Sequence, residues 1–253
     1  MLTAILELVS KQRFSSFLNE HLLKPLDMSS TGYKSITFNS EKLAHGYYYN
    51  ITEEMWLDWG TTQEHLPYNE NHWYSIGKGD IHSSVDDLYK WHIGLEKNKV
   101  LSAKSKEIQE TPYVAENENM TSYYGYGWAI SNSNRDTKIV AHNGSNGIYF
   151  ADFVRFVNDD VVVIYLTNAF LGNDSGNVAQ EISKMIFDSN YNSKPISKNI
   201  YELIHEFINI NNPKDIDLLP SFLENKLGEK LKDHAILNRV GYRKMNKEND
   251  NRN

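Results

Sequence analysis

Residues 139–147 read Ile-Val-Ala-His-Asn-Gly-Ser-Asn-Gly, and residues 148–156 continue as Ile-Tyr-Phe-Ala-Asp-Phe-Val-Arg-Phe. The apolar start of the first run predicts a strand that ends on a polar residue, and the glycines after it predict a turn. A second strand then leads back, and the apolar run at residues 161–167 supplies a third after a short turn. The pattern therefore predicts an antiparallel meander of three strands, Lys138–His142, Gly147–Val157 and Asp160–Thr167.

The end of the first predicted strand is the candidate functional site. His142 offers a cationic or hydrogen-bonding side chain there, and the small residues after it leave backbone N–H groups open. The alternative is a histidine that bonds only to backbone at a strand end. The Asn-Gly-Ser-Asn-Gly context at residues 143–147 favours the functional interpretation, so we expect His142 to face a groove.

This segment and four others resemble, in order along the chain, motifs of the β-lactamase-related serine hydrolases. The His-Asn-Gly at residues 142–144 is similar to the family's third motif, which is Lys-Thr-Gly or, in esterase-like members, His-x-Gly. The other similar stretches are residues 14–33, ending in Pro-Leu-Asp-Met-Ser-Ser-Thr-Gly-Tyr, then 43–47, 77–91 and 124–128. A single match would be weak, but five in order between about Met1 and residue 190 indicate this family.

The resemblance implies an α+β fold, with a β-lactamase/transpeptidase-like antiparallel sheet flanked by helices. We expect residues 1–190 to form a partial domain of this kind and residues 191–253 to form a helical appendage with a disordered tail. In the family, the sheet is completed by strands from an N-terminal part and backed by a further helix. We therefore expect an exposed sheet edge and an exposed apolar face in this chain.

Helical periodicity supports these assignments along the chain. Residues 1–24 predict helices broken near residues 11–13, and residues 84–97 predict a helix with Ser84 as its N-cap and Asp87 at the capping-box position. The expected buried stripe of that helix is Val85, Leu88, Trp91 and Leu95. A closing helix at 177–187 carries Val178, Ile182 and Ile186 on one side, and helical stretches follow near 200–208 and 218–231.

The resemblance also implies two catalytic motifs, a Ser-x-x-Lys nucleophile with its base and a Tyr-x-Asn or Ser-x-Asn. Both precede the matched segments in the family, so we expect this chain to begin just after the second motif and to lack the nucleophile. Ser75–Lys78 and Tyr48–Asn50 match the motifs formally, but in reversed order. The nucleophile must also start a helix, which Gly77 and Gly79 disfavour, so we interpret both matches as chance.

The roles of the site residues are those that the resemblance implies. His142 replaces the family's lysine and would orient the substrate carboxylate or a catalytic tyrosine. Asn143 would offer its amide to the substrate, and Gly144 would let the backbone approach closely. The backbone N–H of Ser145 would be one oxyanion-hole donor, and the second, from the nucleophile, is missing with its serine.

Composition excludes several other classes of function. The 253 residues carry a net charge of −7, which argues against nucleic-acid binding, and they contain no cysteine, which excludes disulfides. The nine histidines show no His-Glu-x-x-His spacing, so we expect no metal and no cofactor. No apolar run approaches a membrane span, and Met1–Val9 lacks the basic flank of a signal peptide. The compartment and the oligomeric state stay open.

The sequence therefore predicts a truncated serine hydrolase that is inactive alone. The complete enzyme would transfer acyl groups from a small-molecule or peptide substrate, namely a D-amino acid peptide, a β-lactam or an ester. One alternative is a non-catalytic protein that retains the cleft to bind a peptide or a partner. Another is that an upstream in-frame segment restores the enzyme and Met1 is an internal methionine.

Overall fold

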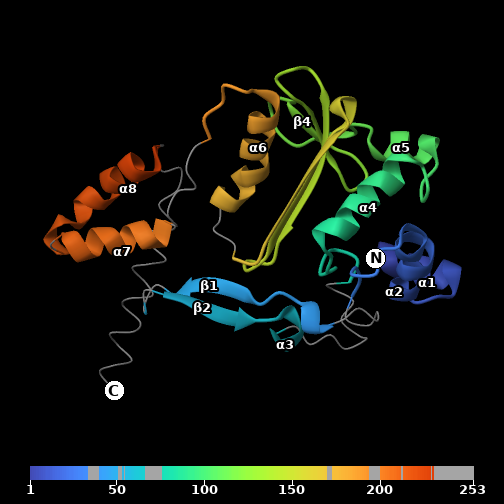
Figure 1. The fold of residues 1–253 in the computed structure, drawn as a ribbon, viewed down its shortest axis with the longest axis horizontal. Coiled ribbons are helices and arrows are strands. Elements are labelled where there is room, and N and C mark those ends of the chain that lie inside the picture. The colour runs from blue at the N-terminus through green and yellow to red at the C-terminus, as the bar shows by residue number, and fades with distance from the viewer. Residues whose placement is uncertain are drawn as a thin grey trace.

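The computed structural model describes residues 1–33, 40–50, 53, 55–65, 76–169, 173–193, 200–211, 213–228 and 230. The chain has an α+β fold in which helices flank an antiparallel sheet (Figure 1). The helices are α1 (Leu2–Ser10), α2 (Phe14–Leu18), α3 (Thr62–His65), α4 (Val85–Glu96), α5 (Ala103–Gln109), α6 (Asn173–Phe187), α7 (Ile200–Ile210) and α8 (Leu219–Leu227). Short π- or 3₁₀-helical segments are η1 (Asn19–Leu23), η2 (Lys24–Leu26), η3 (Ser40–Lys42), η4 (Val157–Asp159) and η5 (Pro213–Leu218).

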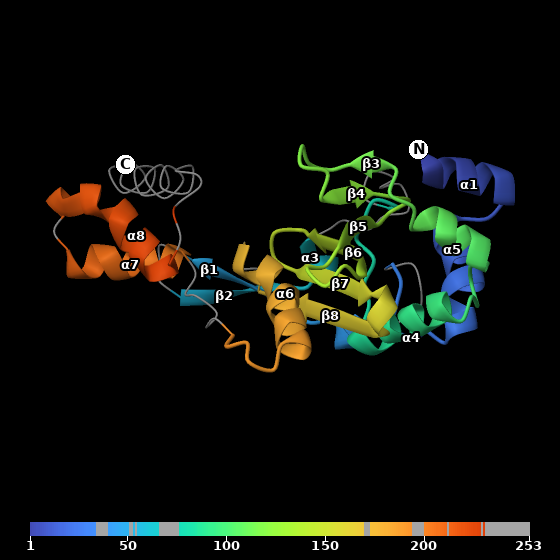
Figure 2. The same ribbon diagram turned by 90° about the horizontal axis from the view of Figure 1, so that it is seen from above.

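Six strands form the main sheet in the order of the chain, each antiparallel to its neighbour. They are β3 (Val114–Ala115), β4 (Ser122–Tyr124), β5 (Ala129–Asn132), β6 (Lys138–Ser145), β7 (Phe150–Phe156) and β8 (Val161–Thr167). The predicted meander is confirmed as β6, β7 and β8. Figure 2 shows β3 and β8 at opposite ends of the sheet.

The first meander strand is longer than predicted. β6 does not end at His142 but continues to Ser145, because Asn143, Gly144 and Ser145 keep pairing with β7. The turn chemistry belongs to the next residues. Asn146 accepts backbone N–H bonds from Ile148 and Tyr149 through its side chain, and Gly147 has a φ of +92°. His142 therefore lies inside a strand and not at its end.

The two faces of the sheet carry separate apolar cores. On one face Leu95 of α4 packs with buried Trp128, Val140 and Phe153. On the other face Ala179 of α6 packs with Phe156 and Val163. Successive residues of β8 point alternately to these two cores, as the pleat requires.

The predicted α4 helix is confirmed, and three of its four predicted stripe residues, Leu88, Trp91 and Leu95, pack in the core, whereas Val85 does not. The Ser84 side chain accepts from the Asp87 N–H at 3.2 Å, as expected for an N-cap. Val85 is 47% exposed, whereas Asp87 is buried. The carboxylate turns inward because it accepts from the Ser30 N–H at 2.7 Å and from the Thr31 hydroxyl at 2.9 Å. Asp87 thus ties α4 to the N-terminal segment.

Helix α6 also presents a different face to the sheet than its apolar stripe suggests. Buried Ala179 packs against β7 and β8, and Ser183, one turn further along, is also buried, whereas Ile182 and Ile186 are 36% and 49% exposed. Small side chains allow the helix to approach the sheet closely. The apolar stripe of α6 is therefore left on one flank of the helix.

The remaining described elements lie beside the sheet. A two-stranded hairpin, β1 (Gly46–Asn50) with β2 (Met55–Gly60), reaches from the sheet towards α7 and α8 (Figure 1). Helices α7 and α8 share a buried cluster, against which Tyr49 of β1 packs. Residues 66–75 and 231–253, which include the predicted disordered tail, lie outside the described residues.

Candidate active site

The candidate site is the part of β6 that extends beyond β5. The pairing of β5 with β6 ends at Ala129 opposite Ala141, whereas β6 continues for four residues alongside β7. Residues 142–147 are all exposed. From His142 onwards, the edge of β6 on the β5 side has no strand partner among the described residues.

The alternation of hydrogen bonds shows which backbone groups line this open edge. The Ser133 N–H donates to the Thr137 carbonyl, so the backbone N–H and C=O groups of odd-numbered β6 residues point towards β5. The Asn146 N–H donates to the Tyr149 carbonyl, so those of even-numbered residues point towards β7. Asn143 and Ser145 therefore direct their N–H and C=O groups to the open edge. The arrangement can accept an extended peptide or an oxyanion.

His142 is held by the loop before β5. Its Nδ1 lies 2.8 Å from the Gly127 carbonyl, and its ring meets Trp128 edge to face at 6.4 Å between centroids. A carbonyl can only accept, so Nδ1 carries the proton and Nε2 is the free nitrogen. A neutral His142 therefore presents an acceptor at Nε2, and it becomes a donor to a carboxylate only when it is protonated.

The Ser145 hydroxyl stabilises the β6–β7 turn through two hydrogen bonds. It donates to the Tyr149 carbonyl at 2.8 Å and accepts from the Gly147 N–H at 2.9 Å. The hydroxyl is thus occupied within the turn, and the backbone N–H is the group of Ser145 that lies at the open edge.

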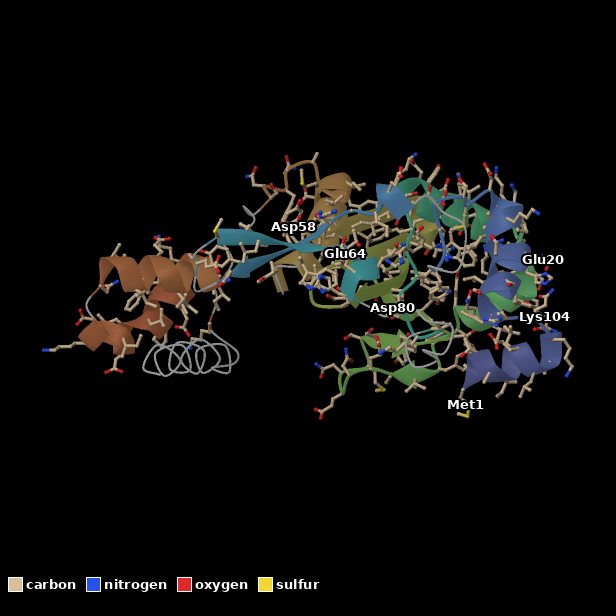
Figure 3. The ribbon with its side chains drawn as sticks, turned by 90° about the horizontal axis from the view of Figure 1, so that it is seen from below. Met1, Glu20, Asp58, Glu64, Asp80 and Lys104 are labelled. Carbon is tan, nitrogen blue, oxygen red and sulfur yellow. The ribbon has the colours of Figure 1, made fainter. Side chains whose placement is uncertain are left out.

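Tyr149 joins the same turn to the β1–β2 hairpin. Its hydroxyl donates to the Ala44 carbonyl at 2.7 Å and lies 3.2 Å from the Gly60 carbonyl. Burial, together with the carboxylates of Asp58 and Glu64, raises the pKa of Tyr149 to about 12, so the phenol stays protonated at neutral pH. Figure 3 shows Asp58 of β2 and Glu64 of α3 beside the sheet.

A second set of bonds fixes the hairpin at the end of β8. The Asn168 amide donates to the His45 carbonyl at 2.7 Å, and the Tyr47 N–H donates to the Asn168 carbonyl at 2.7 Å. His45 Nδ1 lies 2.9 Å from Asp58, and the Gly60 N–H together with His45 lowers the pKa of that carboxyl. The hairpin is thus positioned against the turn that follows Ser145.

Behind the site, Asp152 of β7 is a buried carboxyl group, 6% exposed, opposite Asn143 in the register. Burial raises its pKa to about 6, and the Phe153 N–H bond offsets only part of this effect. No cation pairs with Asp152 among the described residues.

The described residues of the two formal motif matches do not start a helix. Ser75 is outside the described residues, and Lys78 lies in a turn closed by the bridge of Ile76 with Gly79, where Gly77 has a φ of +85°. Tyr48 and Asn50 lie within β1. In the part of the chain that the structure describes, no three His, Cys, Asp or Glu residues are grouped to hold a metal ion, and no helix is long and apolar enough to span a membrane.

The sequence pointed to the strand residues of the candidate site but not to the residues that position them. Gly127, Tyr149, His45, Asp58 and Asn168 act through backbone carbonyls or through contacts between distant segments. The only local signal was that Tyr149 follows a glycine-containing turn.

Comparison with known proteins matches most of the chain to one family. A family model described as Beta-lactamase matches residues 1–182. Penicillin-binding protein 4* of Bacillus subtilis (strain 168) is 27% identical over 173 residues, which is 66% of this chain and 38% of that protein.

Solved structures share the fold. The octameric penicillin-binding protein homologue from Pyrococcus abyssi is similar with a TM-score of 0.59 and 23% identity, over 74% of this chain and 40% of that one. A D-stereospecific amidohydrolase from Streptomyces sp. is similar with a TM-score of 0.58 and 16% identity, over 75% of this chain and 52% of that one. The chain spans about two fifths of the length of the first relatives that it matches.

Proposed function

The chain belongs to the beta-lactamase family, and we propose that its residues 142–145 form the oxyanion side of an acyl-transfer site of the serine hydrolase type. The substrate class that we propose is a D-amino acid peptide, a β-lactam or an ester. Similarity to a penicillin-binding protein and to a D-stereospecific amidohydrolase supports this class. We further propose that the 253 residues supply no nucleophile and that the chain is inactive alone.

The observation that carries the proposal is the open edge of β6. Asn143 and Ser145 direct backbone groups to that edge, where the carbonyl of an extended substrate would meet the Ser145 N–H. The exposed Asn143 amide lies one residue away, and Gly144 adds no side chain to obstruct the approach. Protonated His142 would bind the substrate carboxylate through Nε2.

The proposed absence of catalysis rests on the residues that are present. The single Ser-x-x-Lys match in the sequence is Ser75–Lys78, and Lys78 lies in a turn rather than on a helical face. A serine without a base on the same face stays a weak nucleophile. A site with one oxyanion donor and no nucleophile can bind a substrate but has little means to form an acyl-enzyme.

The alternative function, a non-catalytic binder of peptides, is favoured by the same open edge. Adding an extended peptide to a free strand edge is a common mode of recognition. The two functions differ in stereochemistry, because an acyl-transfer site of this class would prefer a D-amino acid terminus.

We propose to test the site by titrating isotope-labelled protein with a peptide that ends in D-Ala-D-Ala, and with its L-Ala-L-Ala counterpart as the control. The expected result is a set of amide chemical-shift changes centred on Asn143 and Ser145, larger for the D-peptide. Equal effects of both peptides would favour the general peptide binder. Changes confined to other parts of the protein would refute the assignment of the site.

A further inference from the structure

The sequence contains the dipeptide Asn-Gly twice, at residues 143–144 and 146–147. All four residues are exposed. In an Asn-Gly pair, the backbone nitrogen of the glycine can attack the side-chain carbonyl carbon of the asparagine, because glycine has no side chain to shield that nitrogen and its backbone adapts easily. The structure places the two copies in different surroundings, one in a turn and one in a strand.

At Asn146 the side chain is folded back over the peptide that follows it. Its Oδ1 accepts from the Ile148 N–H at 3.0 Å and from the Tyr149 N–H at 2.9 Å. Because these donors come after Gly147 in the chain, the fold-back brings the side-chain carbonyl carbon beside the Gly147 nitrogen, the approach that ring closure needs. Gly147 has a φ of +92°, and a Cβ atom there would meet nothing within 4 Å, so the backbone has room to adjust.

The same two hydrogen bonds polarise the carbonyl group that is attacked. When the Gly147 nitrogen adds to the carbonyl carbon, negative charge develops on Oδ1 of Asn146. The Ile148 and Tyr149 N–H groups already point at that oxygen and act as an oxyanion hole. The Gly147 N–H also donates to Ser145 Oγ at 2.9 Å, which gives its proton a hydroxyl oxygen through which to leave. The turn therefore holds the electrophile, the nucleophile and the oxyanion donors together.

Asn143 is also followed by a glycine, but it lies inside the β-ladder. Gly144 pairs with Ala151 and, as an even-numbered residue of β6, directs its N–H towards β7. Attack by this nitrogen would break a ladder hydrogen bond and would require the extended strand to fold back on itself. Among the described residues, no N–H group donates to the side-chain oxygen of Asn143. The strand thus keeps the reacting groups of this copy apart.

We propose that Asn146 is a site of spontaneous succinimide formation and that Asn143 is protected from it. The Gly147 nitrogen forms a bond to Cγ of Asn146 and loses its proton, while the bond from Cγ to Nδ2 breaks and the side-chain nitrogen leaves as ammonia. Water then opens the succinimide ring at either carbonyl group. One product has aspartate at position 146, and the other has an isoaspartyl linkage, in which the main chain runs through the former side chain.

Either product changes the turn at the end of the open β6 edge. Aspartate adds a negative charge, and the isoaspartyl linkage lengthens the main chain of the turn by a methylene group. The Ser145 hydroxyl bonds the Tyr149 carbonyl and the Gly147 N–H across this turn, and a longer chain cannot keep both bonds as they are. The modification therefore loosens the last pair of β6 with β7, Ser145 with Phe150.

The test follows both asparagines over time in the 253-residue protein at mildly alkaline pH. Trypsin cleavage after Lys138 and Arg155 releases one peptide that contains both Asn-Gly copies. Fragmentation mass spectrometry then assigns the mass gain to either asparagine, and an isoaspartyl methyltransferase detects the isoaspartyl product. The control is the same protein unfolded in concentrated urea at the same pH and temperature. Asn143→Ser and Asn146→Ser are matched variants that each leave a single copy.

We expect Asn146 to react at least about tenfold faster than Asn143 in the folded protein, and faster than it reacts in urea, where the two rates should be similar. Asn143→Ser should keep the isoaspartyl signal, and Asn146→Ser should lose it. A smaller ratio in the folded protein, or an Asn146 that reacts no faster folded than unfolded, would overturn the proposal. This chemistry needs no substrate, so such a result would leave the proposed acyl-transfer site unaffected.

Discussion

Asp152 shows how a single buried carboxyl group can set the pH dependence of stability. Its folded-state pKa of about 6 lies above the value near 4 of an unfolded chain. The neutral form is thus favoured in the folded protein. The contribution of the protonated Asp152 carboxyl group to the free energy of unfolding is complete below about pH 4 and is lost as the pH rises through about 6. Above that pH, the fold carries the cost of a buried charge.

Replacing this carboxyl with an amide should remove that cost. We predict that Asp152→Asn raises the free energy of unfolding by about 1–2 kcal/mol near pH 7.5 and changes it little near pH 4. Urea unfolding at both pH values measures the difference. Asp217→Asn, at an exposed carboxylate, is the control and should have no such pH-dependent effect. Equal stability of Asp152→Asn and the unmodified protein near pH 7.5 would show that the carboxylate is solvated.

The residues of the candidate site show how far this site could be predicted from the sequence. Residues 142–145 were identified because histidine, glycine and serine follow an apolar run in a recognisable order. Tyr149 and Gly127 were not, because their roles depend on segments 105 and 15 residues away in the chain. Spacing in a sequence indicates local chemistry, but a backbone carbonyl that orients a ring leaves no residue-type signal.

At the level of secondary-structure elements, a buried ion-pair network connects α4 and the end of α5 to the sheet. Arg155 of β7 is only 1% exposed. Its guanidinium forms ion pairs with Glu96 of α4 and with Glu110, which follows α5 and lies 2.5 Å away. Lys138 and Lys106 supply further contacts to these carboxylates, at 3.5 Å each. Removing the arginine would leave buried Glu110 without its closest cationic partner.

We predict that Arg155→Met lowers the free energy of unfolding by about 3 kcal/mol or more, because an uncompensated carboxylate stays buried. The matched control is Arg135→Met, which removes the partially exposed pair with Asp159 and should cost about 1 kcal/mol or less. Thermal or urea unfolding of both variants provides the comparison. Similar losses for the two would contradict the structural role of the buried network.

Element types were predicted better than element faces. The period of apolar residues located α4, α6 and the three meander strands, and Ser84 signalled the start of α4. The faces differed where contacts between distant segments decided them. The turn at Ser30 and Thr31 draws Asp87 inwards, and the small side chains of Ala179 and Ser183 bring α6 close to the sheet. A periodic pattern cannot reveal such partners.

For the whole molecule, the organisation into residues 1–190 and 191–253 stays a prediction. The cluster of α7 and α8 is built mainly from those two helices, with Tyr49 as a contribution from the hairpin. We predict that a protein of residues 1–193 keeps its thermal midpoint within about 5 °C of the complete chain. A loss of cooperative unfolding in that fragment would show that α7 and α8 are part of the main domain.

The central claim is that this chain supplies the oxyanion side of an acyl-transfer site without a nucleophile. The most direct test incubates purified 1–253 with a fluorescent penicillin and a fluorophosphonate probe, beside an intact family member as the positive control. The account predicts no stoichiometric label on any serine, because Lys78 lies in a turn and cannot activate Ser75 from a shared helical face. Stoichiometric labelling mapped to Ser75 and abolished by Lys78→Ala would contradict it.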